Sequence, residues 1–229
     1  MKGPRPGAAG RIRVVRFGSW RPAPGEEEPD IGFTDPRFRR RLSLISRMTI
    51  RVIRDIMPLG EETKIYFVSF RGEVNRQFTI NKALFEEGEI PPAAFSLSVF
   101  NAPPALASMA LNLTAGYSAV YPGGNNFRSA LRGAAASLLA VPPGGAPRSG
   151  ERLALAYADE ALIPEYRPLG RVPPGAAPGH SVPPLAFAAL LSAAPEDGAG
   201  AALPPEEDWE TPGAFLGALE RAFDQESRP

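Results

Sequence analysis

The stretch from Gly116 to Phe127, GYSAVYPGGNNF, has the pattern of a buried strand that stops at two glycines and then opens a helix. In α/β enzymes such a corner commonly holds a nucleophile or a phosphate, because free amides and the helix dipole stabilise negative charge there. The corner lacks the lysine and the glycine spacing of a phosphate loop, and it lacks the G-x-S-x-G pattern of a nucleophile elbow. In the alternative interpretation, Gly123 and Gly124 only permit a tight turn.

Cysteine and histidine, two side chains that often carry catalysis, are absent or nearly absent from this chain. There is no cysteine, which excludes disulfides, thiolate metal sites and cysteine nucleophiles together. The single histidine, His180, lies in the proline-rich stretch PPGAAPGHSVPP and is interpreted as a surface-loop residue. We therefore expect no metal site and no cofactor.

Two charged motifs are candidate functional sites. The basic run RFRRRLSLISRM starts at Arg37 and includes Arg39, Arg40 and Arg41, which could bind an acidic carrier or line a solvated helix face. Asp159 and Glu160 follow a predicted strand, and because neighbours in an extended segment point to opposite sides, a turn or capping role is favoured over a carboxylate pair.

Composition and charge narrow the class of protein. The chain has 229 residues with 25 basic and 25 acidic side chains, so no net field favours nucleic acid or an acidic membrane. The N-terminus lacks the apolar core of a signal peptide, and the longest apolar run, PPLAFAALLSAA, is too short for a membrane span. We expect a cytoplasmic protein with no nucleic-acid partner.

The helices and strands that position these residues are predicted from the spacing of apolar residues in the segments between clusters of proline and glycine. Runs rich in β-branched and aromatic residues predict five strands, which start at Ile12, Lys64, Tyr117, Arg152 and Leu185. Helical spacing predicts helices over residues 35–56, 73–88, 103–113, 125–140 and 211–226, with caps at Asp35, Gly88 and Asn125 or Asn126.

The alternation of these elements predicts an α/β fold. Strands separated by helices imply right-handed crossovers, so we expect a mostly parallel five-stranded sheet with helices on both faces. The last two strands are joined by a loop alone, which predicts that one edge is antiparallel. We expect a disordered tail over residues 1–10, one domain over 11–194, and a linker with a docked amphipathic helix over 195–229.

Several motifs, in order along the chain, resemble those of a known protein family. These motifs resemble segments of the β-ketoacyl synthases, which have the thiolase fold. They are RRRLSLISRM, FSLSVFNA, the stretch from GYSAV to AAASLL, and ALAYADE. The resemblance is closer to short proteins described as chain-length factors, which keep only the N-terminal half of the synthase, and it covers about residues 11–194. It implies half of a thiolase-like fold.

The resemblance also implies what the glycine corner has lost. Counted from Asn101, the nucleophilic cysteine of the synthases would fall at Gly124, with Gly123 and Asn125 as neighbours. Phe100 stands where the short proteins often have histidine. The catalytic histidines of the synthases belong to the C-terminal half, and His180 matches neither of them. A pseudo-ketosynthase is therefore expected, without catalytic residues of its own.

By the same resemblance, the expected partner is a cysteine-bearing ketosynthase subunit in a heterodimer, with an acyl carrier protein as a further partner. The pathway would be type II fatty-acid, polyketide or aryl-polyene-like biosynthesis. The residues expected at the partner interface or acyl tunnel are Asn101, Leu106, Met109, Ser118, Ala119, Val120, Tyr121 and Phe70. Two alternatives stay open: a scaffold or acyl-binding homodimer that kept the half-fold, and an enzyme of unrelated chemistry at the glycine corner.

Overall fold

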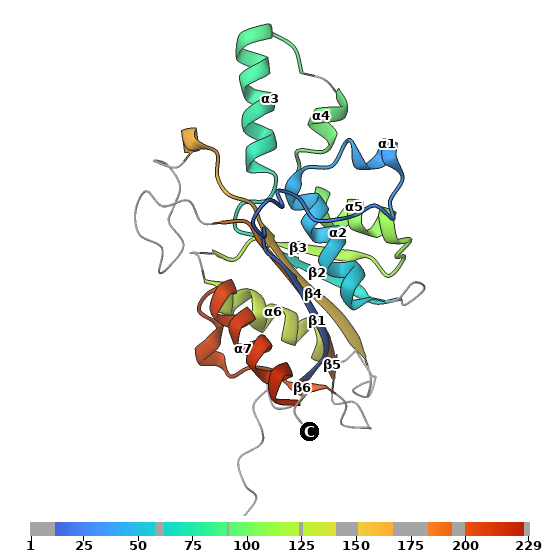
Figure 1. Cartoon of the computed structure of the whole chain (residues 1–229), viewed down its shortest axis with the longest axis vertical. Helices are drawn as coiled ribbons and strands as arrows, with labels where there is room; N and C mark the ends of the chain where they lie inside the picture. Colours follow the sequence, from blue (N-terminus) through green and yellow to red (C-terminus); the bar gives the residue numbers. More distant parts are fainter. Residues whose placement is uncertain are drawn as a thin grey trace, which may run out of the picture.

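The computed structural model describes residues 12–57, 62–90, 92–123, 126–140, 151–166, 183–193 and 200–226. Its centre is a six-stranded sheet in the order β3-β2-β4-β5-β1-β6, with helices on both faces (Figure 1). The strands are β1 (Ile12–Trp20), β2 (Lys64–Val68), β3 (Tyr117–Val120), β4 (Arg152–Asp159), β5 (Leu185–Ala193) and β6 (Ala201–Ala202).

The sheet is mixed, and most of its strands run in one direction. β2 pairs in parallel with both β3 and β4, whereas β5 pairs antiparallel with β4 and with β1. β1, β2, β3 and β4 therefore point the same way, which agrees with the expected mostly parallel sheet. The sequence did not predict β6, because two alanines carry no periodic signal.

The antiparallel strand β5 lies inside the sheet and not at its edge. The expected antiparallel pairing of β4 with β5 is confirmed, but β1 pairs along the other side of β5, from Ile12 opposite Ala193 to Trp20 opposite Ala186. After its first residue, β5 is buried at every position. A continuous apolar run is typical of such a central strand, because both of its faces are covered.

One face of the sheet is covered by α2 (Leu44–Ile56) and α5 (Ala102–Leu111). The predicted helix over 35–56 is in fact two helices, because Ser43 caps a new start by accepting a hydrogen bond from the backbone of Ser46. Asp35 caps only the short α1 (Pro36–Arg39), which holds Arg39, whereas Arg40 and Arg41 lie in the connection to α2.

The other face is covered by α6 (Phe127–Leu139) and by α7 (Pro212–Glu226), which is the expected docked C-terminal helix. Asn126 caps α6 by accepting from the backbone of Ser129. Phe215 of α7 is fully buried and lies 5.9 Å from Phe127 and 5.7 Å from Phe187, measured between ring centroids. This aromatic contact fixes α7 to the sheet.

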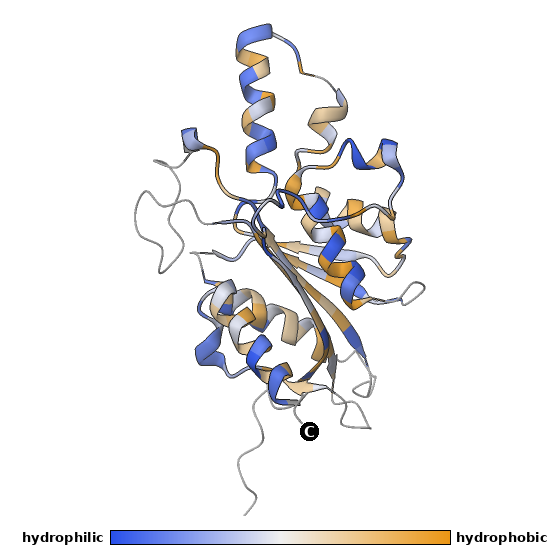
Figure 2. Cartoon of the chain, in the orientation of Figure 1, coloured by the Kyte–Doolittle hydropathy of each residue, from blue (hydrophilic) through white to orange (hydrophobic). Residues whose placement is uncertain are grey.

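Helix α3 (Val74–Glu87) and the short α4 (Pro92–Ser96) project from the body of the molecule (Figure 1). Helix α3 ends as predicted at Gly88, whose φ of 77° is left-handed. Ile80 is the one buried residue of α3, and hydrophilic and hydrophobic residues alternate along the helix (Figure 2). Leu84, Phe85 and Phe95 are exposed.

Among the described residues, no helix is long and apolar enough to cross a membrane.

Candidate functional site

The carboxyl ends of three neighbouring parallel strands meet at one edge of the sheet. β3 leads into the glycine corner, β2 leads into a turn over residues 69–73, and β4 ends at Asp159 and Glu160. The backbone N–H of Ser69 donates to the carbonyl of Val120 at 3.3 Å, which ties the β2 turn to the end of β3. In open α/β sheets this is the edge at which ligands bind.

The glycine corner is open at Gly123. A Cβ atom added to Gly123 would meet no atom within 4 Å, and Gly123 is not among the glycines with positive φ. Neither the backbone nor the space therefore demands glycine at this position, which weakens the tight-turn interpretation for Gly123. Gly124 and Asn125 lie outside the described residues, as does His180, so the position of the lost nucleophile stays a prediction.

Asp159 organises the turn that follows β2. Its carboxylate accepts hydrogen bonds from the hydroxyls of Ser69 at 2.6 Å and Tyr157 at 2.7 Å, and from the backbone N–H groups of Phe70 at 3.1 Å and Arg71 at 3.0 Å. The expected turn-stabilising role is confirmed for Asp159. This role explains why a buried carboxylate is tolerated here.

Burial dominates the electrostatics around Asp159. Loss of hydration raises the pKa of Asp159, although the hydrogen bonds from Ser69 and Tyr157 oppose the shift. Burial and the neighbouring charge of Asp159 raise the pKa of Tyr157 well above its usual value. The Tyr157 phenol is therefore a hydrogen-bond donor at neutral pH and not a base.

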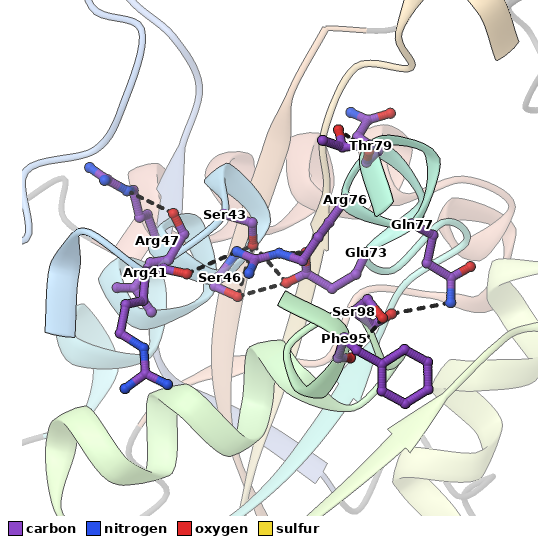
Figure 3. Close-up of polar contacts among 12 residues, drawn as sticks. Arg41, Ser43, Ser46, Arg47, Glu73, Arg76, Gln77, Thr79, Phe95 and Ser98 are labelled. Carbon is purple, nitrogen blue, oxygen red and sulfur yellow. Dashed lines mark hydrogen bonds and ion pairs between the residues drawn. The ribbon is translucent and has the colours of Figure 1, made fainter. Parts of the chain in front are cut away.

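Glu73, at the start of α3, is a second buried carboxylate at this edge. It accepts hydrogen bonds from Ser43, the N-cap of α2, at 2.6 Å, from Ser46 in the first turn of α2 at 2.9 Å, and from Arg76 at 3.2 Å (Figure 3). Burial raises its pKa, although these three partners oppose the shift. The two serine contacts join the N-terminus of α2 to the start of α3, and Arg76 also donates to the carbonyl of Arg41, just before α2, at 2.9 Å.

Glu160 is the third buried carboxylate. Burial and the negative charges of Glu73 and Asp159 raise the pKa of Glu160 to about 7, with Arg76 acting in the opposite direction. Sequence reasoning placed Asp159 and Glu160 correctly after a strand, but it missed Glu73. Glu73 is 86 positions before Asp159 in the sequence, and no local sequence pattern indicates that the two lie close together.

The hydrogen bonds of Asp159 and Glu73 hold the turn after β2 and the base of α3. The hydroxyls of Ser43 and Ser46 donate to Glu73, and that of Ser69 donates to Asp159. Among the residues that the structure describes, no group of three or more histidine, cysteine, aspartate or glutamate side chains could hold a metal ion.

The residues predicted at a partner interface or tunnel fall into two groups. Met109 is 70% exposed and Tyr121 52%, whereas Leu106 is 6% exposed and packs in the core between α2, α5 and the sheet. Leu106 therefore lies inside the chain and not on its surface. Phe70 is half-buried and lies 6.3 Å from Tyr157, measured between ring centroids.

Strand β3, which carries Ser118, Ala119 and Val120, is the edge strand of the sheet beside β2. Asn101 donates its side-chain amide to the hydroxyl of Tyr117 at 3.1 Å, so the start of α5 is fixed to the start of this strand. The structure thus brings Asn101, β3 and Tyr121 to one edge of the molecule.

Comparison with known proteins agrees with this architecture. The family model of the β-ketoacyl synthase N-terminal domain matches residues 18–206. A similar solved structure is the ketosynthase ApeO in complex with its chain length factor ApeC from Xenorhabdus doucetiae, with a TM-score of 0.57 and 18% identity. The match covers 80% of this chain and 79% of that chain. No curated protein matches the sequence.

Proposed function

The chain belongs to the β-ketoacyl synthase N-terminal-domain family, and from this premise we propose that it is a non-catalytic, chain-length-factor-like subunit of a cysteine-bearing ketosynthase. The two chains would form a heterodimer in type II fatty-acid or polyketide biosynthesis of the aryl-polyene type. The partner would supply the thiolate that holds the acyl chain, since this chain has no cysteine.

The observation that carries the proposal is the free edge of β3. The carbonyls of Gly116 and Val120 accept from Ile65 and Ser69 on the β2 side. Because backbone groups alternate along a strand, those of Tyr117, Ala119 and Tyr121 face away from β2. No strand of the described chain covers that side. Such an edge is a template for a strand from another chain.

Exposed side chains at the end of β3 and on α5, which packs against β3, support the same proposal. Met109 on α5 and Tyr121 after β3 are large and exposed, and burial of such side chains contributes to association. The similar solved structure adds weight, because its printed description is a ketosynthase bound to a chain length factor. The match covers nearly equal fractions of the two chains, so the matched chain is about as long as this one.

The proposal is tested by co-expression with a cysteine-bearing ketosynthase from the same genome and co-purification through a tag on this chain. Ala119→Pro removes one outward-facing N–H and leaves the β2 ladder intact, because proline is tolerated on an edge strand. We expect the amount of ketosynthase recovered to fall at least about tenfold, a change of about 1.4 kcal/mol in binding.

Ala119→Ser is the matched control, since it keeps the N–H and should recover the ketosynthase as the wild type does. Both variants should keep the circular dichroism spectrum of the wild type. Equal recovery with both variants would contradict strand addition through β3. A stable homodimer that ignores the ketosynthase would favour the scaffold alternative, because the same edge can pair with a second copy.

A further inference from the structure

The attachment of α3 to the rest of the molecule is mainly polar. The first turn of α3 makes the contacts: Asn75 donates to the carbonyl of Ala161 at 2.8 Å, Arg76 contacts Glu73 and Arg41, and Gln77 donates to the carbonyl of Ser98 at 3.2 Å. Apolar burial contributes little, since Ile80 is the one buried residue of the helix. The position of α3 thus depends on its base.

Three buried carboxylates from two segments, Glu73 before α3 and the adjacent Asp159 and Glu160 at the end of β4, lie at that base. Glu73 is 2% exposed, and Asp159 and Glu160 are each 6% exposed. Of the ion pairs found among the described residues, one involves these carboxylates, between Glu73 and Arg76. The other nearby guanidinium, that of Arg71, donates to the backbone carbonyl of Glu160 at 2.6 Å. Buried negative charge therefore exceeds the positive charge paired with it.

Glu160 is the member of this group whose side chain is least constrained by short hydrogen bonds. Asp159 accepts four hydrogen bonds, and Glu73 accepts three. Glu160 faces the charges of Glu73, Arg76 and Asp159 and the amide of Asn75. Asn75 also accepts from the backbone N–H of Ile163 at 3.3 Å, so it joins α3 to the segment after Glu160.

We propose that the protonation state of Glu160 controls how firmly the base of α3 is held, so that α3 and α4 become more mobile as the pH rises through neutrality. Neutral Glu160 fits beside Glu73 and Asp159 without repulsion. Ionised Glu160 places a negative charge beside the Glu73 and Asp159 carboxyl groups in a buried site, which favours opening of the α3 base to water. The inference does not depend on the proposed function.

The direction of the effect follows from linkage. The pKa of Glu160 is about 7 in the closed state and has the ordinary value of 4.5 when opening exposes the side chain to water. The closed state therefore binds more protons between these values, and its stability falls as the pH rises through this range. With these two values, the opening constant rises about tenfold between about pH 6 and about pH 8.

Hydrogen exchange followed by mass spectrometry tests the proposal on the full chain at both pH values, after correction for the intrinsic exchange rate. In the wild type, peptides of α3 should lose protection about tenfold from the lower to the higher pH, whereas peptides of α7 should not change. Glu160→Gln should abolish the pH dependence in α3. Glu86→Gln, an exposed position on the same helix, should keep it.

The proposal is overturned if wild-type α3 and α7 peptides show the same pH dependence, or if Glu160→Gln retains the wild-type profile. Glu160→Ala serves as a second neutral variant if Glu160→Gln does not fold. If neither variant folds, carbon-13 NMR of the glutamate carboxyl groups in the wild type decides. A titration near neutrality coupled to α3 resonances supports the proposal, and glutamates that all titrate near their ordinary pKa overturn it.

Discussion

Gly72 is the residue at which backbone and packing constrain the sequence most directly. Its φ of 56° lies in the left-handed region, and a Cβ atom would come within 2.6 Å of the Phe100 ring. Phe100 also lies 6.4 Å from Phe67, measured between ring centroids, so displacement of its ring would disturb this aromatic contact. The turn that Asp159 organises therefore requires glycine at this position.

Gly72→Ala should lower the free energy of unfolding by about 2 kcal/mol, from backbone strain and from displacement of the Phe100 ring. Chemical denaturation measures the change. Gly123→Ala is the matched control, because Gly123 has open space and no positive φ, and it should stay within about 0.5 kcal/mol of the wild type. Equal effects at both glycines would contradict this account of the turn.

At the scale of the elements, α5 presents one residue inward and another outward within a single turn. Leu106 is buried in the chain's own core, whereas Met109 is exposed. Since both residues were predicted at the seam or tunnel, the structure separates their roles. Leu106 packs in this chain's own core, and under the proposed function Met109 is the residue of the two that would contact a partner.

Leu106→Ala should lower the free energy of unfolding by about 3 kcal/mol, as expected for a buried leucine, whether or not a ketosynthase is present.

Met109→Ala should leave the unfolding free energy of the isolated chain nearly unchanged and reduce ketosynthase recovery in co-purification. A reversed pattern, with Met109 important for stability and Leu106 for recovery, would contradict the assignment.

The sequence predicted most elements because their signals are local. Five strands, the α3 end at Gly88 and the Asn126 cap of α6 all follow from residues within a few positions of one another. The break between α1 and α2 was missed because Ser43 lies inside an otherwise helical pattern. The carboxylate cluster was missed because Glu73 meets its neighbours only through the packing of β2 against β4.

At the scale of the whole molecule, the described chain covers both faces of its sheet and leaves one edge free. Helices α2 and α5 cover one face, α6 and α7 cover the other, and β6 adds to β1 at the far edge. β3 is left as the edge strand at the opposite side, next to the glycine corner (Figure 1). A partner that adds to β3 would extend the sheet and lie beside that corner.

Site-specific photo-crosslinking tests the account most directly. A photoreactive phenylalanine analogue replaces Tyr121, at the end of β3, in the chain co-expressed with the ketosynthase. The same analogue at Arg221, an exposed position on α7, is the control. We expect a heterodimer adduct from position 121 and none from position 221. Three results would contradict the account: equal adducts from both positions, an adduct only between two copies of this chain, or no adduct from position 121.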